Sequence, residues 1–215
     1  MFADVKVLKA LLKKAYKGTG VTIEDQYGGM AIHTDFWGVW ITEEDLTNDI
    51  KAAVVEVLGE LPKEDEAWTC RAKRDNQQAL PKSLFDMQQL LGIAKEQSER
   101  ARITPLMYMQ ETESKDLVLC RVIQGTKRLE EYDELGKVPL FGSIALINNA
   151  FADWIADDNK DMKEGNEQRP VGPMMSLENG VVVWYNDRCL MYCYMRDDSK
   201  EREEEMIKTL EMKEW

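Results

Sequence analysis

The spacing of hydrophobic and polar positions changes several times along the chain, and each change predicts the end of one element and the start of another. From Ala3 to Lys17, apolar residues recur at helical spacing with lysines on the opposite side, which predicts an amphipathic helix. Two short alternating runs, 21–26 and 30–34, flank the turn Tyr27-Gly28-Gly29 and predict a β-hairpin. Residues 37–41 add a third strand.

The next part of the sequence predicts further helices and strands in alternation. Apolar residues at helical spacing over 45–58 predict a second helix, and Thr42 followed by Asp45 suggests its N-cap. The polar stretch 63–81 reads as a connection that holds one short strand, 68–72. A helix over 84–97 and strands over 103–110 and 117–124 follow.

A third round closes the chain. It is predicted to begin with a helix at Phe141, whose apolar face comprises Ile144, Ile147, Phe151, Trp154 and Ile155. Strands are predicted over 174–177, 181–185 and 190–195, and a final charged helix over 199–215.

The recurring unit, a helix followed by an antiparallel hairpin, predicts an α+β protein. Each such unit can bury its apolar strand face only against its own and neighbouring helices, so sheets covered by helices are expected. Two halves are predicted, 1–80 and 81–215, although one continuous pseudo-repeat fold fits the same pattern.

Composition adds a segregated distribution of charge. The chain has 215 residues and a net charge of −12, from 28 basic and 40 acidic side chains. Residues 1–17 carry 5 − 1 = +4 and residues 67–102 carry 7 − 4 = +3, whereas 18–66 carry 2 − 12 = −10 and 103–215 carry 14 − 23 = −9. The first helix is therefore a cationic segment of an acidic protein.

Cysteine spacing and hydropathy place the protein in the cytosol. The four cysteines match neither a secreted disulfide framework nor a zinc site, and Cys189 and Cys193 are predicted to pack as small apolar side chains on one face of a strand. No stretch has the ~18 consecutive apolar residues of a membrane span. We therefore expect a cytoplasmic protein with no membrane partner.

Motifs for catalysis, metals and cofactors are weak in this sequence. His33 and Asp35 would share one face of a strand, but no nucleophile motif accompanies them, which favours a structural histidine. The run 157–161 lacks the glycine and glutamate of a calcium loop, and no phosphate-binding glycine motif occurs. We expect no cofactor, no metal site and no enzymatic activity.

The order of elements resembles the DNA sliding clamp fold, the processivity ring of replicative polymerases. The stretch 103–108 leading into 117–124, and residues 180–185 after a proline-led strand, follow the clamp pattern. The resemblance implies that helices line a channel and offer basic side chains to the DNA backbone without reading sequence. The residues that would carry this contact are Lys6, Lys9, Lys13, Lys14, Lys17, Arg71, Lys73 and Arg74.

Two features depart from the clamp pattern and keep other functions open. The second helix presents Asp45, Asp49, Glu56 and Glu60 where a DNA-lining helix would be basic, and the third-round helix shows Asn148, Asn149 and Asp153 in place of lysines. The chain is also short for a ring subunit. One alternative is a protein-interaction or regulatory module that uses its acidic surface and an exposed aromatic residue, either Trp37 or Trp40. Another is a hydrolase centred on His33 and Asp35, which requires a pocket around them. The sequence does not determine the oligomeric state.

Overall fold

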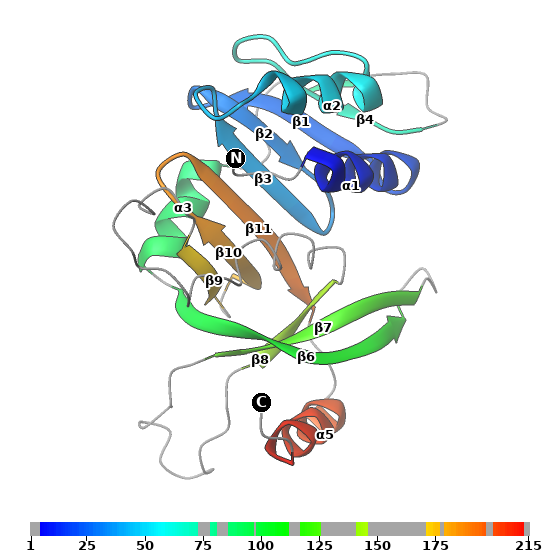
Figure 1. The fold of residues 1–215 in the computed structure, drawn as a ribbon, viewed down its shortest axis with the longest axis vertical. Coiled ribbons are helices and arrows are strands. Elements are labelled where there is room, and N and C mark those ends of the chain that lie inside the picture. Colours follow the sequence, from blue (N-terminus) through cyan, green and yellow to red (C-terminus); the bar gives the residue numbers. More distant parts are fainter. Residues whose placement is uncertain are drawn as a thin grey trace.

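The computed structural model of the chain describes residues 5–72, 78–80, 86–96, 98–111, 117–125, 141–145, 171–176, 179–196 and 200–212 (Figure 1). The helices are α1 (Val5–Lys17), α2 (Asn48–Leu58), α3 (Met87–Glu96) and α5 (Lys200–Glu211). The strands are β1 (Val21–Gln26), β2 (Gly29–His33), β3 (Trp37–Thr42), β4 (Ala67–Cys70), β5 (Gln78–Leu80), β6 (Glu99–Glu111), β7 (Leu117–Gly125), β8 (Phe141–Ala145), β9 (Val171–Ser176), β10 (Val181–Tyr185) and β11 (Cys189–Arg196). The predicted α+β class is confirmed.

Every strand pairing in the described part is antiparallel, and β11 is the strand to which most of the sheet is connected. One series of pairings runs from β10 through β9, β6, β7 and β8 to β11, and β11 also pairs with β10, so these six strands form a closed circuit. From β11 the sheet continues through β3, β2, β1 and β4 to β5. Strands from both ends of the sequence therefore belong to one sheet.

Helices α1 and α2 lie side by side over one face of this sheet (Figure 1). Leu8 and Leu12 of α1 and Val54 of α2 are buried against the strand residues that point to the same side, including Trp37 and Trp184. Because the apolar face of each helix packs on the apolar side of the strands, the helices and the sheet bury a continuous hydrophobic core between them.

Helix α3 covers the other face of the same strands. Its buried residues Met87 and Leu90 pack with Trp40, Val183 and neighbouring apolar residues in a second core cluster. Trp37 and Trp40 therefore point to opposite faces, as the alternation of a strand requires, but both are buried, with 1% and 7% of their surface exposed. The prediction that one of them is exposed was wrong because it did not foresee helices on both faces.

Most predicted elements are present, and two predictions are corrected. Residues 141–145 form strand β8, whereas a helix was predicted there; the rest of that predicted helix lies outside the described residues. The N-cap of α2 is Thr47, whose hydroxyl oxygen accepts a hydrogen bond from the Ile50 amide at 3.4 Å. Thr42, the predicted cap, is the last residue of β3.

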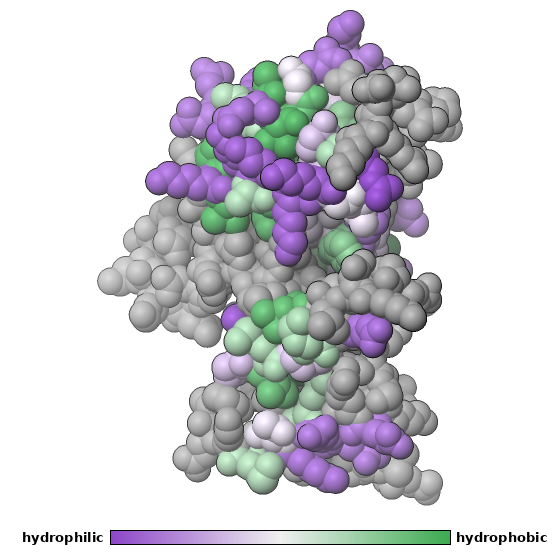
Figure 2. All heavy atoms as spheres, turned by 90° about the vertical axis from the view of Figure 1, so that its right-hand side faces the viewer, coloured by the Kyte–Doolittle hydropathy of each residue, from purple (hydrophilic) through white to green (hydrophobic). Residues whose placement is uncertain are grey.

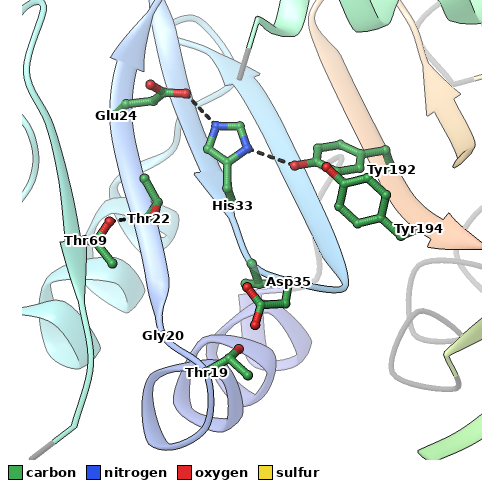
Figure 3. Close-up of a pocket in the computed structure, with 10 residues that line it drawn as sticks. Thr19, Gly20, Thr22, Glu24, His33, Asp35, Thr69, Tyr192 and Tyr194 are labelled. Carbon is green, nitrogen blue, oxygen red and sulfur yellow. Dashed lines mark hydrogen bonds and ion pairs between the residues drawn. The ribbon is translucent and has the colours of Figure 1, made fainter. Parts of the chain in front are cut away.

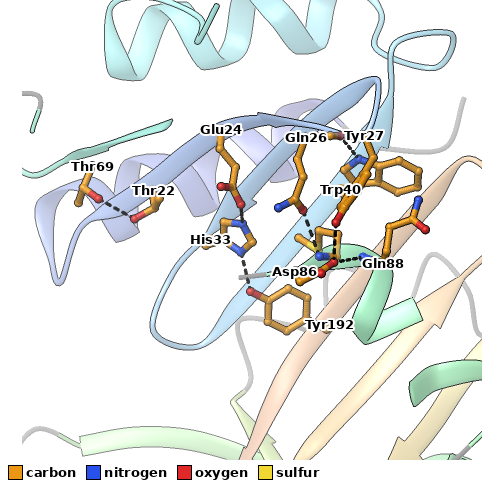
Figure 4. Close-up of polar contacts among 11 residues, drawn as sticks. Thr22, Glu24, Gln26, Tyr27, His33, Trp40, Thr69, Asp86, Gln88 and Tyr192 are labelled. Atoms are coloured by element: carbon orange, nitrogen blue, oxygen red, sulfur yellow. Dashed lines mark hydrogen bonds and ion pairs between the residues drawn. The ribbon is translucent and has the colours of Figure 1, made fainter. Parts of the chain in front are cut away.

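The start of α3 is attached to the β1–β2 turn by polar contacts (Figure 4). Asp86 Oδ1 accepts hydrogen bonds from the amides of Gln88 at 2.9 Å and Gln89 at 3.1 Å, which is the geometry of a helix N-cap. The Tyr27 hydroxyl donates to the same oxygen at 3.1 Å, and this bond is the main reason that the Tyr27 pKa is raised. Gln26 Oε1 accepts from the Met87 amide at 3.0 Å.

Replacing Asp86 by alanine is expected to lower the free energy of unfolding by about 1 kcal/mol, because the helix amides at the start of α3 lose their acceptor. Urea unfolding of Asp86→Ala and Asp86→Asn measures the effect, and asparagine should retain most of the stability because it also caps helices. An alanine variant as stable as the parent would show that this cap does not hold α3.

All four cysteines are buried and free, as predicted for reduced core residues. Burial raises the pKa of Cys70 to about 11 from its usual 9.0, and burial likewise raises the pKa values of Cys189 and Cys193. Above pH 9 the thiols of the unfolded chain therefore lose protons that the folded chain keeps.

The free energy of unfolding is accordingly expected to fall as the pH rises from 9 toward 11. Urea unfolding at several alkaline pH values tests this expectation, and a Cys70→Ala variant should show a shallower decline. If the decline is equally steep in Cys70→Ala, ionisation of this thiol does not contribute to it.

Candidate functional site

The lysines predicted to contact nucleic acid lie along α1, in the helical layer above the sheet. Lys6, Lys13, Lys14 and Lys17 are exposed and Lys9 is partly exposed, while α1 itself contains no acidic residue. In Figure 2, hydrophilic side chains gather over the part of the molecule where Figure 1 places α1 and α2. The amphipathic pattern thus brings the five lysines of this helix to the surface.

One carboxylate of α2 meets two of these lysines. The Lys9 ammonium group donates to Glu56 Oε2, and Lys13 Nζ lies 3.4 Å from Glu56 Oε1. The hydrogen bond from Lys9 is the main reason that the pKa of Glu56 is lowered. The acidic residue that departs from the clamp pattern therefore neutralises part of the lysine face.

Basic side chains also meet at the C-terminal end of α1. Lys14 and Lys17 belong to its last turn, and neither has an ion pair with a described residue. Arg71 follows β4, and its Nε donates to the carbonyl oxygen of Gly18 at 2.8 Å, just after the helix. The structure therefore brings Arg71 to α1, whereas Lys73 and Arg74 lie outside the described residues.

A polar cavity lies on the opposite face of the sheet from α1 and α2 (Figure 3). Its volume is about 220 Å³, and it opens between the α1–β1 connection and strands β1, β2, β4 and β11. The described residues that line it are Thr19, Gly20, Thr22, Glu24, His33, Thr34, Asp35, Thr69, Tyr192 and Tyr194. His33 and Asp35 share a face, as predicted.

A chain of hydrogen bonds crosses the inner wall of this cavity. His33 Nε2 lies 2.5 Å from Glu24 Oε1, and His33 Nδ1 lies 2.9 Å from the Tyr192 hydroxyl oxygen. Burial raises the pKa of Tyr192, so its hydroxyl keeps its proton. The Tyr192 hydroxyl is hydrogen-bonded to Nδ1 of His33 and also to Tyr194, and the Glu24 carboxylate is the acceptor for a proton on Nε2. The side chains of Glu24 and His33 are only 2% and 11% exposed.

Gly38 makes the contact between His33 and Tyr192 possible. The backbone pairings place His33 of β2 opposite Gly38 of β3, and Gly38 opposite Tyr192 of β11. The Tyr192 ring occupies the space above Gly38, where a Cβ atom would overlap its ring carbons and hydroxyl oxygen. Tyr192 can therefore reach across β3 to His33 only because residue 38 has no side chain.

Sequence reasoning found His33 and Asp35 but missed Glu24, Gly38 and Tyr192. Alternation along β1 places Glu24 in phase with Thr22 on the face away from α1, which was a usable signal. The partnership with Tyr192 required the pairing of β3 with β11, which no local pattern reveals. The pocket that the hydrolase alternative requires is thus present, although the hydroxyl groups among its described lining residues belong only to threonine and tyrosine.

Other predicted absences concern only part of the chain. Within the described residues, no group of three or more histidine, cysteine, aspartate or glutamate side chains is arranged to hold a metal ion. The calcium-loop-like run 157–161 lies outside them. Among the described helices, none combines the length and the hydrophobicity that a membrane-spanning segment requires.

Comparison with known proteins adds a weak resemblance of fold. No protein-family profile matches the chain, and no curated protein matches it in sequence. A search of solved structures finds the crystal structure of the DNA polymerase III beta subunit from Thermotoga maritima, with a TM-score of 0.31 and 11% sequence identity. The match covers 91% of this chain and 63% of that subunit. At this TM-score and identity the likeness carries no conclusion about the site or the function.

Replacing Gly38 by alanine is expected to lower the free energy of unfolding by about 1–3 kcal/mol, because the new methyl group displaces the Tyr192 ring. Gly92→Ala is the matched control, since this glycine lies in α3 with open space around its Cβ position. That substitution should stabilise the protein by up to about 1 kcal/mol. Urea unfolding of both variants makes the measurement, and equal effects would contradict the close packing at Gly38.

Proposed function

We propose that this chain is a non-enzymatic binding or accessory module that contacts a nucleic-acid backbone through the lysine face of α1. The observation that supports the proposal is the charge of the helical layer. Helix α1 carries +5 and α2 carries 1 − 2 = −1, so the two helices together carry +4 on a chain with a net charge of −12. A local cationic surface on an acidic protein favours an anionic partner.

The lysines of this surface can bind phosphate groups but cannot distinguish one base sequence from another. Lysine ammonium groups on a helix attract backbone phosphates as point charges and release condensed counterions when they bind. Such contacts position a protein on a duplex but carry no sequence information. We therefore expect affinity that is independent of sequence and strongly dependent on salt.

The pairing of Glu56 with Lys9 and Lys13 determines which lysines are most available. Exposed ion pairs contribute little to stability, so a phosphate could replace Glu56 as their partner without unfolding the helix layer. Lys14, Lys17 and Arg71 form a cationic end of α1 that involves no such exchange. We propose this end as the first point of contact.

The location of the protein, its division into halves and its association in solution are also proposals. Four buried free thiols suit a reducing compartment, which supports a cytosolic location. That the protein works without a membrane partner and without a cofactor remains a prediction. The division into halves 1–80 and 81–215 remains a prediction. A clamp-like ring would require several subunits, and the measured mass in solution decides whether the chain associates.

A protein-interaction or regulatory module without nucleic-acid contact is the second candidate. Two large apolar side chains of β6, Met107 and Met109, are each 48% exposed, and methionine is common at adaptable protein interfaces. The buried positions of Trp37 and Trp40 exclude them as the exposed aromatic residue of that surface. A stoichiometric protein partner that survives nuclease treatment would favour this candidate.

The double variant Lys14→Glu, Lys17→Glu is expected to bind duplex DNA at least about tenfold more weakly at low salt, because two phosphate contacts become repulsive. Fluorescence anisotropy at several salt concentrations measures both the affinity and its salt slope, which should decrease by about 2. These two lysines are chosen because neither has an ion pair with a described residue, so the fold should remain intact.

The control is the double variant Lys63→Glu, Lys208→Glu, which changes the net charge by the same amount at exposed positions outside α1 that also have no ion pair with a described residue. Its DNA affinity should stay much closer to that of the parent protein. If both double variants weaken binding equally, net charge and not the α1 surface is responsible. If the parent protein binds neither duplex nor single-stranded DNA at low salt, the proposed function is wrong.

A further inference from the structure

The cavity around His33 has a chemistry that the proposed nucleic-acid contact does not use. It lies on the face of the sheet opposite α1, and its described lining contains neither lysine nor arginine. With about 220 Å³ of space it has room for roughly seven water molecules at ~30 Å³ each. A ligand of a few non-hydrogen atoms therefore fits.

The charge of the lining residues determines whether the cavity favours a cationic or an anionic ligand. Glu24 and Asp35 contribute two carboxylates, and His33 is the one basic side chain among the described lining residues. With both carboxylates ionised, the lining carries −2 when His33 is neutral and −1 when it is protonated. In either case the cavity attracts a cation and repels phosphate or carboxylate ligands.

Glu24 supplies a specific acceptor for a hydrogen-bond donor. Its Oε1 is bonded to His33, whereas Oε2 has no hydrogen-bond partner among the described residues. Only 2% of this side chain is exposed, so little water can solvate the second oxygen. Glu24 is a lining residue of the cavity, and Oε2 is not one of the sealed polar atoms of the described core, so a donor group placed in the cavity could give this carboxylate a second hydrogen bond.

The wall opposite Thr22 and Thr69 is aromatic (Figure 3). The rings of Tyr192 and Tyr194 lie edge to face, with centroids 5.5 Å apart. Aromatic rings attract cations and also offer contact surface to methylene groups. The threonine hydroxyls across the cavity, which bond to each other at 2.8 Å, are further acceptors for ammonium hydrogens.

We propose that this cavity binds a small primary alkylammonium group, the chemistry shared by free short amines and by the side chain of lysine. The ammonium group would donate to Glu24 Oε2 and lie within the field of Asp35, while its methylene groups contact the two tyrosine rings. This inference is independent of the proposed function, since it concerns the other face of the sheet.

The test uses the whole 215-residue chain and three probes at neutral pH, and NMR or calorimetric titration measures the affinity for each probe. The probes are n-butylammonium, Nα-acetyl-lysine amide and 1-butanol, which has the shape of the first probe without its charge. At least one ammonium probe is expected to bind at least about tenfold more tightly than 1-butanol, which corresponds to one hydrogen bond to a charged group.

Variants locate the binding to the cavity. Asp35→Asn removes an exposed charge, so it should leave the fold intact and weaken ammonium binding by several-fold. Glu24→Gln should weaken it by at least about tenfold. The matched control Asp65→Asn makes the same charge change at an exposed position outside the cavity and should leave binding unchanged.

The outcomes separate the sources of the ligand and decide the proposal. Binding of n-butylammonium alone indicates a free amine, and binding of Nα-acetyl-lysine amide alone indicates a lysine side chain. Binding of both supports the shared ammonium chemistry. The proposal is overturned if 1-butanol binds as tightly as the ammonium probes, or if neither ammonium probe binds. It is also overturned if a folded Asp35→Asn variant binds as the parent does; that readout remains available even if Glu24→Gln fails to fold.

Discussion

The antiparallel pairing of β11 with β3 is the interaction on which the rest of the structure depends. Residues 189–193 of β11 pair with 37–41 of β3, so strands from opposite ends of the chain become neighbours. The other edge of β11 pairs with β10, and its last residues pair with β8. Without β11 the strands β1–β5 would have no connection to the other strands of the closed circuit.

Both candidate surfaces follow from this arrangement, and each belongs to a different face of the sheet. On one face, α1 and α2 cover the apolar side chains and turn their charged side chains outward, where lysines and Glu56 meet. On the other face, α3 covers one part of the strands, and the polar cavity occupies a neighbouring part. Because the β-strand alternation is strict, Ile23 contributes to one core while Glu24 enters the cavity.

Local patterns predicted the elements well but not their partners. The hairpin was predictable because two short alternating runs flank the glycine turn Tyr27-Gly28-Gly29. In the structure Tyr27 and Gly28 both have positive φ, 52° and 67°, as in a type I′ turn. The strand at 141–145 was missed because the apolar positions that follow it in sequence suggested helical spacing. The lysine face of α1 was predictable from its period alone, whereas the pairing of Lys9 with Glu56 required the packing of α1 beside α2.

The cavity shows the limit of sequence reasoning more clearly. Alternation puts Thr22 and Glu24 on one side of a strand and His33 and Asp35 on one side of the next. No spacing rule states that Tyr192, far along the chain, bonds to His33. That contact depends on a long-range strand pairing, and long-range pairings are set by the whole sheet, not by any segment of it.

Because residue 38 has no side chain, positions 38 and 192 are expected to vary together among related sequences. A relative that acquires a larger residue at 38 has no space for the ring of Tyr192 above β3, and it loses the neighbour that holds His33 in place. Substitutions at these two positions are therefore tolerated together more readily than singly. Glycine at 38 paired with tyrosine at 192 is a signature by which chains that keep this cavity can be distinguished from chains that keep only the fold.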